Sequence, residues 1–244
     1  MSDKKDLSRP EMRGEVARSD GSMISSFLNA AKRVAPVTDA GPRPRLVFAL
    51  DATMSRQPTW DLACRVQGEM FATASAVGGL SVQLVYFRGF AECRASRFVV
   101  EPRALTDLMG KIDCRGGHTQ IGRVLRHVRD EASRAPVKAL VYVGDAMEEP
   151  IDELCAAAGE LGLLGVKAFM FHEGADSTAG DAFQEIARLS GGAYARFDAN
   201  APGSLANLLR AAAAYAAGGV AALERLAASD GKARALLTSM SRRA

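Results

Sequence analysis

The sequence predicts a doubly wound α/β fold: a mostly parallel sheet with one antiparallel edge strand and helices on both faces. Short, continuous apolar runs alternate with segments of helical length, which is the order of elements in βαβ proteins. The runs are apolar throughout, as in strands that are buried on both faces. One pair of runs is separated only by Arg88-Gly89, a connection short enough for an antiparallel hairpin.

The first elements are predicted from apolar runs and from the glycines that end them. Residues 46–50 form an apolar strand that ends at Asp51. A helix is expected at 60–77, because Gly78-Gly79 follows and ends it. The strands of the hairpin are then expected at 80–87 and 90–100.

The alternation continues to the end of the predicted sheet. A short helix is expected at 104–112, and a longer one at about 120–134 after the loop that begins at Gly116-Gly117. A last core helix is expected at 204–215, with Ser204 as its N-cap. Between them we expect strands at 139–144, 166–171 and 193–197, and helices at 151–163 and 181–189.

Composition divides the chain into three parts. Residues 1–44 mix charged residues with Ser and Pro, which predicts a flexible N-terminal arm. A short docking helix at 25–34 is the alternative for this part. Residues 45–215 are the predicted α/β domain. Residues 216–244 contain a helix break at Gly218-Gly219 and predict a helical C-terminal tail that docks on the domain or on another protein.

Composition and charge exclude several classes of protein. Of the 244 residues, 48% are hydrophobic and 24% are charged, and the mean hydropathy is -0.02, as in ordinary globular proteins. The net charge of +3 gives no argument for binding nucleic acid or a membrane surface. We see no apolar run of about 18 residues, so no transmembrane helix is expected.

The start of the chain and the cysteines favour the cytoplasm. The first six residues are polar and lack the apolar core of a secretory signal. The four cysteines lie far apart, without the spacing of a zinc site, as buried thiols in a reducing compartment do. They are Cys64, Cys93, Cys114 and Cys155.

Polar side chains follow two of the predicted buried strands and fill a loop between them. Asp51, Thr53 and Ser55 follow the first strand, Asp145 follows the fourth, and Thr119 lies in the intervening loop. In open α/β sheets ligands bind beyond the carboxyl ends of the strands. An all-oxygen set of donors suits Mg²⁺ or Mn²⁺ rather than zinc. Two carboxylates leave such an ion under-neutralised, so water or an outside acidic oxygen has to complete its shell.

Capping offers a structural alternative for the same five residues. Asp, Thr and Ser are common at the first turn of a helix, where their oxygens accept backbone hydrogen bonds. Under this interpretation no ion is bound. The three histidines are likewise interpreted as structural, with His127 on the surface of its helix and His172 at a strand end. His118, beside Thr119, is the one best placed to touch the surroundings of an ion or a partner.

The loop residues also resemble a known family. Asp51-Ala52-Thr53-Met54-Ser55 resembles the Asp-x-Ser-x-Ser motif of von Willebrand factor A (VWA) domains. Thr119, with Gly117 before it and Gly122 after it, is similar to the second motif of the family. Asp145, at the end of an apolar strand, is similar to the third. Together these motifs form a metal ion-dependent adhesion site, and the resemblance covers roughly residues 45–215.

The resemblance implies a Rossmann-like domain and a function in binding proteins. The hydroxyls of Thr53, Ser55 and Thr119 would contact Mg²⁺, and Asp51 and Asp145 would act directly or through water. A Glu or Asp of a partner protein would take the remaining position. Together with the composition and the cysteines, the resemblance leads us to expect a cytoplasmic adaptor that is not an enzyme and binds neither nucleic acid nor membrane.

The sequence departs from the family pattern at two places. Thr53 replaces the usual first Ser of the motif, which keeps the hydroxyl and adds a methyl group. Glu148-Glu149 follow Asp145 where the family often has Gly, and their charge either strengthens ion retention or repels an acidic ligand.

Two other functions remain open. Haloacid dehalogenase-like phosphohydrolases also place a nucleophilic Asp after a strand, with a second Asp two residues later as the acid/base. Here Thr53 holds that second place and cannot act as a general acid near neutral pH. Lys138 precedes its strand rather than facing the site. The third possibility is a structural VWA module whose site is vestigial.

Overall fold

The structure is a computed structural model, and it describes residues 43–198 and 200–241. Almost all of the predicted N-terminal arm, and the docking helix proposed within it, lie outside the described residues.

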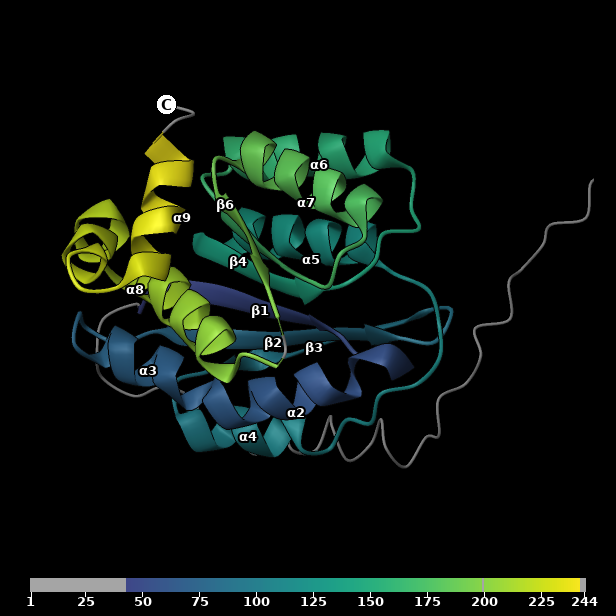
Figure 1. Cartoon of the computed structure of the whole chain (residues 1–244), viewed down its shortest axis with the longest axis horizontal. Coiled ribbons are helices and arrows are strands. Elements are labelled where there is room, and N and C mark those ends of the chain that lie inside the picture. The colour runs from purple at the N-terminus through teal and green to yellow at the C-terminus, as the bar shows by residue number, and fades with distance from the viewer. Residues whose placement is uncertain (1–42, 199, 242–244) are drawn as a thin grey trace, which may run out of the picture.

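A six-stranded sheet forms the middle layer of the fold, with the strand order β3-β2-β1-β4-β5-β6 (Figure 1). Every neighbouring pair is parallel except β2 and β3, which form the antiparallel hairpin at the edge. The predicted doubly wound sheet with one antiparallel edge strand is thus confirmed. The strands are β1 Arg45–Asp51, β2 Ser81–Arg88, β3 Glu92–Val99, β4 Val137–Gly144, β5 Lys167–Glu173 and β6 Ala193–Phe197.

Helices cover both faces of this sheet (Figure 1). On one face lie α2 Gln57–Val66, α3 Gly68–Ser75, α4 Pro102–Met109, α8 Pro202–Ala227 and α9 Gly231–Ser241. On the other face lie α5 Ile121–Arg134, α6 Ile151–Leu163 and α7 Ser177–Ser190. A 3-10 turn, η1 Met54–Arg56, connects β1 to α2.

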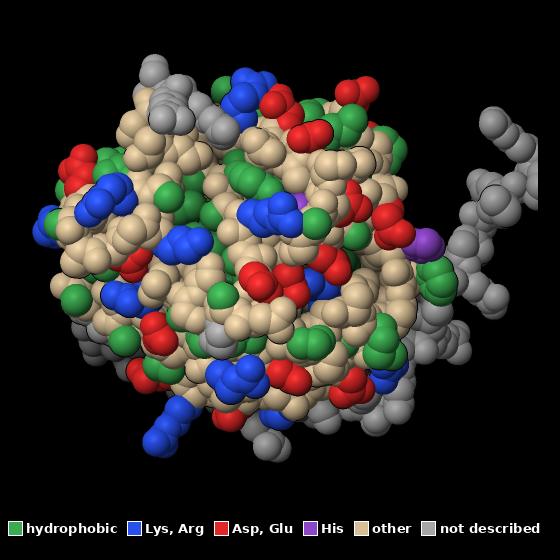
Figure 2. Space-filling model, viewed as in Figure 1, with side chains coloured by type: hydrophobic (Ala, Val, Ile, Leu, Met, Phe, Trp, Pro, Cys, Tyr) green, Lys and Arg blue, Asp and Glu red, His purple; other side chains and the backbone are tan. Residues whose placement is uncertain are grey.

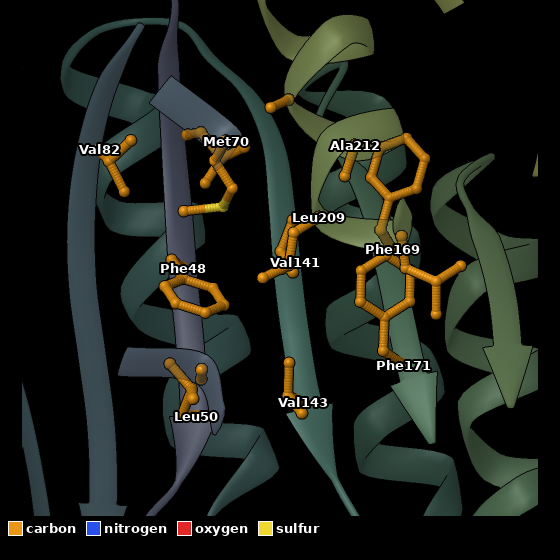
Figure 3. Packing of buried hydrophobic residues seen from close by; sticks show 14 of the residues in the cluster. Phe48, Leu50, Met70, Val82, Val141, Val143, Phe169, Phe171, Leu209 and Ala212 are labelled. Carbon is orange, nitrogen blue, oxygen red and sulfur yellow. The ribbon is translucent and has the colours of Figure 1, made fainter. Parts of the chain in front are cut away.

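Two hydrophobic clusters, one on each face, explain why the strand sequences are continuously apolar. In β1, Phe48 and Leu50 belong to the cluster beneath α2, α3 and α8. Val47 and Ala49 belong to the cluster beneath α5, α6 and α7. Because successive strand residues point to opposite faces, both sets must be apolar. Figure 3 shows the first cluster, with Phe48 and Leu50 of β1 beside Val141 and Val143 of β4 on the same face of the sheet.

The strand order reverses direction between β1 and β4. From β1 the chain crosses to β2 through α2 and α3, on one face of the sheet. From β4 it crosses to β5 through α6, on the opposite face. The loops after β1 and β4 therefore part from each other at the carboxyl edge, which is the usual ligand position in doubly wound folds.

Some element boundaries differ from those predicted. The helix expected at 60–77 is two helices, α2 and α3, which meet at Gln67. The first of them, α2, begins at Gln57, three residues earlier than expected, because a proline is well suited to the first turn of a helix. Ser204 is not an N-cap: α8 begins at Pro202, and the Ser204 N–H donates to the carbonyl of Ala201 within the first turn. The second hairpin strand begins at Glu92 rather than at residue 90.

His127 is half-buried rather than on the surface. Its Nε2 lies 2.9 Å from Oε1 of Gln83 on β2. Burial lowers the pKa of His127, so the ring is biased towards its neutral form.

The residues after Tyr215 pack onto the domain. The helix α8 continues through a kink at Gly218 and Gly219 to Ala227, so the predicted break is a bend rather than an end. Asp230 then caps α9 by accepting the N–H groups of Lys232 and Ala233. Of the two docking alternatives, the structure shows the tail on its own domain. Leu223 of α8 and Leu236 of α9 are buried in the core cluster.

One described helix, at 203–227 within α8, is long and apolar enough to cross a membrane by length and composition alone. The sequence predicted a core helix at 204–215, but no helix long and apolar enough to cross a membrane was expected. In the structure Leu205, Leu208 and Leu209 are fully buried against the sheet, as in the core helix of a globular domain. The length and composition of the segment thus match its place in the core.

The packing of α9 gives a stability prediction. Leu236 is 1% exposed, so Leu236→Ala is expected to lower the free energy of unfolding by about 2–5 kcal/mol in urea titrations. The control Leu163→Ala changes a side chain that is 91% exposed, and is expected to stay within about 0.5 kcal/mol of wild type. An unchanged midpoint for Leu236→Ala would mean that the domain folds without α9.

Candidate functional site

Asp51 ends the central strand β1 and is buried, with 3% of its surface exposed. Its Oδ1 accepts the backbone N–H of Thr53 at 2.7 Å. Its Oδ2 is buried and has no hydrogen-bond partner among the described residues. Burial raises the pKa of Asp51 to about 6, against the lowering effect of the Thr53 hydrogen bonds. One oxygen of a buried carboxyl is therefore left for another ligand.

Hydroxyl groups connect the loop after β1 to the loop after β4. The Oγ1 of Thr53 lies 3.4 Å from the Oγ of Ser55. The Ser55 hydroxyl in turn donates to Oδ2 of Asp145 at 3.2 Å. The structure thus brings together four of the five predicted residues: Asp51, Thr53, Ser55 and Asp145.

Thr119 is tied to the same edge through Glu148. The backbone N–H of Thr119 donates to Oε2 of Glu148 at 2.9 Å, and the backbone N–H of Glu148 donates to Oγ1 of Thr119 at 3.0 Å. Within the described chain, Thr119 shares no hydrogen bond with the other four predicted residues. This reciprocal pair fixes the Thr119 loop to the loop that begins at Asp145.

Glu149 holds the beginning of α5. Its two carboxylate oxygens accept the N–H groups of Ile121 and Gly122, the latter at 2.9 Å. These N–H groups lie in the first turn of the helix, where no carbonyl within the helix can accept them. Burial raises the pKa of Glu149, and the two backbone hydrogen bonds oppose that rise. Of the acidic pair noted in the sequence, Glu148 therefore holds Thr119 and Glu149 holds the first turn of α5.

Arg56 is a residue of the site that sequence reasoning missed. Its side chain is almost fully buried, and its Nη1 lies 3.4 Å from Oδ2 of Asp145. Its Nη2 donates to Oε2 of Glu173 at the end of β5, and the hydroxyl of Thr59 donates to the same oxygen. The only sequence signal was the position of Arg56 directly after Ser55. Its acidic partners lie 89 and 117 residues later in the chain.

A second buried polar atom lies beneath these loops. The hydroxyl of Tyr142 on β4 is buried and, like the Asp51 oxygen, finds no partner in the part of the chain that the structure describes. Burial raises the pKa of Tyr142 well above its usual value, and the charge of Asp51 adds to the rise. A Cβ at Gly144 would lie 2.8 Å from the Tyr142 hydroxyl, so a glycine leaves room for the ring.

The Thr119 loop rests on the hairpin between β2 and β3. The His118 N–H donates to the carbonyl of Gly89 at 3.2 Å, and Nε2 of Gln120 donates to the carbonyl of Arg88 at 3.2 Å. Gly117 packs so closely that a Cβ there would lie 2.2 Å from the Gly89 carbonyl oxygen. Close backbone contact therefore sets the position of this loop.

Exposed apolar side chains flank the site. Met54 is 63% exposed and Phe90 is 71% exposed. The ring of Phe90 lies edge-on to His118, with centroids 5.1 Å apart, and His118 pairs with Glu148 at 3.2 Å. Figure 2 shows charged side chains of both signs gathered near the carboxyl end of β6. The carboxyl edge thus combines acidic groups, a buried arginine and an apolar rim.

The donor chemistry of this edge fits a hard cation. The groups that converge are carboxylate and hydroxyl oxygens, which Mg²⁺ and Mn²⁺ prefer. The described residues contain no cluster of three or more His, Cys, Asp or Glu side chains arranged to hold a metal ion. An ion here would rest on two carboxylates and on hydroxyls. The unpartnered oxygen of Asp51 is the structural feature that fits it.

Comparison by sequence gives no match to a family model or to a curated protein. Comparison by structure matches the VWA domain of SpRpn10, with a TM-score of 0.54 and 10% identity over 67% of this chain and 95% of that one. The fold is a VWA-like fold. Proximal thread matrix protein 1 from the mussel byssus, in a structure with a zinc-occupied MIDAS motif, matches with a TM-score of 0.56 and 15% identity.

The VWA-like chain covers unequal shares of these proteins. Its match to the mussel protein covers 72% of this chain and 47% of that one. The pilus adhesin SpaC from Lactobacillus rhamnosus GG matches with a TM-score of 0.52 and 12% identity, over 70% of this chain and 30% of that one. The resemblance in fold is confirmed, whereas the roles of the five site residues stay predictions.

The contact between Gly117 and Gly89 can be tested by a matched pair of substitutions. Gly117→Ala would force the Thr119 loop away from the hairpin, and is expected to lower the free energy of unfolding by about 1–3 kcal/mol. Gly116→Ala meets no atom within 4 Å and is expected to be close to neutral. Equal unfolding midpoints for the two variants would contradict the described packing.

Asp51 gives a pH-dependent prediction. The pKa is about 6 in the folded protein and near 3.8 in the unfolded chain. The folded state therefore binds this proton more tightly, and its stability falls as pH rises between these values. Without metal and above pH 6, Asp51→Asn is expected to raise the free energy of unfolding by about 1–3 kcal/mol.

Urea unfolding in EDTA from pH 4 to 8 measures this difference. The exposed Asp107→Asn serves as the control and should follow wild type at every pH. An Asp51→Asn variant that is less stable than wild type at pH 7 would contradict the burial cost assigned to Asp51.

Proposed function

We propose that this VWA-like chain is a protein-binding module that uses a metal ion-dependent adhesion site. Asp51, Thr53, Ser55, Thr119 and Asp145 would hold Mg²⁺ or Mn²⁺. The bound ion would supply a positive charge that accepts a Glu or Asp side chain of a partner protein. The VWA-like fold supports this proposal, and so does the zinc-occupied MIDAS motif of the mussel protein.

The observation that carries the proposal is the unpartnered oxygen of Asp51. A buried carboxylate oxygen without a hydrogen bond costs free energy, because burial removes it from water. Asp51 is linked through Thr53 and Ser55 to Asp145 by hydrogen bonds. A cation at this place would offset the cost of burial and lower the pKa of Asp51 towards its usual value.

The chain's own residues prepare the site. The Thr53 N–H orients Asp51, and Ser55 orients Asp145. Glu148 holds Thr119 at the same edge. Because these bonds already exist in the described structure, a partner would meet groups that need little further ordering.

We also propose that the chain is not an enzyme and acts as a cytoplasmic adaptor, without binding nucleic acid or membrane. A phosphohydrolase of the haloacid dehalogenase type would need an acid/base group at Thr53, where the side chain is a hydroxyl. Hydrolysis of a phosphomonoester in Mg²⁺ that is lost in Asp51→Asn would overturn this part of the proposal.

One observation favours a second candidate, a structural module with a vestigial site. The Arg56 guanidinium contacts Asp145, so a protein cation already neutralises part of one predicted metal ligand. Under this reading no partner depends on metal.

Capture experiments separate the two candidates. Immobilised wild type is expected to retain a partner in Mg²⁺ and release it in EDTA, whereas Asp51→Ala and Thr119→Ala should lose at least about tenfold in affinity. The exposed Asp107→Ala is the matched control and should behave as wild type. Circular dichroism confirms that each variant is folded. Metal-independent capture, or equal capture by all variants, would support the vestigial site.

A further inference from the structure

We propose that Arg56 competes with the metal ion for Asp145 and so weakens binding of a lone divalent ion. This inference rests on the proposed function, because it assigns Asp145 to the ion. Arg56 is then a positioning residue that sets the affinity of the site, a role that no motif of the sequence indicates.

The competition follows from a shared oxygen. The Oδ2 atom of Asp145 accepts the Ser55 hydroxyl and also lies 3.4 Å from Nη1 of Arg56. Ser55 and Asp145 are both predicted ligands of the ion. An ion that contacts them would therefore share its carboxylate with a guanidinium, and the two cations would repel each other.

Arg56 is held in place and cannot turn into solvent. It is 2% exposed, and its Nη2 donates to Glu173. Glu173 is itself held by the hydroxyl of Thr59 on α2. An arginine stays protonated at every physiological pH, so its charge is a permanent part of the site.

The consequence is a coupling between ion and partner. Repulsion by Arg56 weakens the binding of a lone ion. A carboxylate from a partner adds negative charge and offsets this repulsion. Each of the two then binds more tightly in the presence of the other, as linkage requires. The wild type would hold its ion tightly only in the complex.

Mn²⁺ binding to the full chain, measured from the electron paramagnetic resonance signal of free Mn²⁺, tests the competition. The double variant Arg56→Gln/Glu173→Gln removes one charge of each sign, so the net charge is unchanged and Glu173 is not left as a carboxylate without its arginine. It is expected to bind Mn²⁺ at least about tenfold more tightly than wild type. Equal or weaker binding by the folded double variant would overturn the proposal.

Two further variants separate charge from packing. Arg56→Lys keeps the positive charge and should bind Mn²⁺ as wild type does. Glu173→Gln keeps Arg56 and should not bind more tightly than wild type. If Glu173→Gln alone reproduced the gain of the double variant, the effect would belong to Glu173, and the competition would be refuted.

Adding Asp51→Ala to the double variant locates the ion. If Asp51→Ala removes the gain, the ion binds at the proposed site and Arg56 controls it. Tight binding that survives Asp51→Ala would refute the proposed site. Binding that depends on Asp51 but is equal in wild type and the double variant would refute only the role of Arg56.

Discussion

A buried carboxyl at the end of the central strand is the constraint on which this edge of the molecule depends. Asp51 lies where the strand order reverses, beneath loops that leave towards opposite faces of the sheet. One of its oxygens accepts a backbone N–H, and the other is buried without a partner among the described residues. Under the proposed function, a cation at this edge would offset the cost of burying this oxygen.

That shell is held by acidic side chains as well as by backbone contact. The carboxylate oxygens of Glu148 and Glu149 accept backbone hydrogen bonds from the Thr119 loop and from the first turn of α5. Much of the negative charge that the sequence places after β4 is therefore committed to local structure. Gly117 adds a backbone contact that leaves no room for a side chain. The loops keep their positions through these bonds, and Asp51 keeps one buried oxygen that no described residue contacts by a hydrogen bond.

Local sequence patterns predicted the sheet, but they did not predict side-chain contacts between residues far apart in the chain. The run at 46–50 is apolar throughout because its side chains are buried on both faces of the sheet, and such a run is visible in the sequence alone. The first helix divides at Gln67, and α8 begins before Ser204. The helix propensities of neighbouring residues at these places are too similar for the sequence to predict either boundary. The contacts of Arg56 with Asp145 and Glu173 join segments far apart in the chain, and no local pattern records them.

The central claim is that the loops after β1 and β4, together with the Thr119 loop, form one cation site. A crystal structure of the chain soaked in Mn²⁺ at a concentration well above the dissociation constant of the lone ion, with data collected near the manganese absorption edge, tests this most directly. We expect one anomalous peak within bonding distance of a side-chain oxygen of Asp51, Ser55 or Asp145. Well-ordered loops without a peak at this edge, or a peak bound only by other residues, would contradict it.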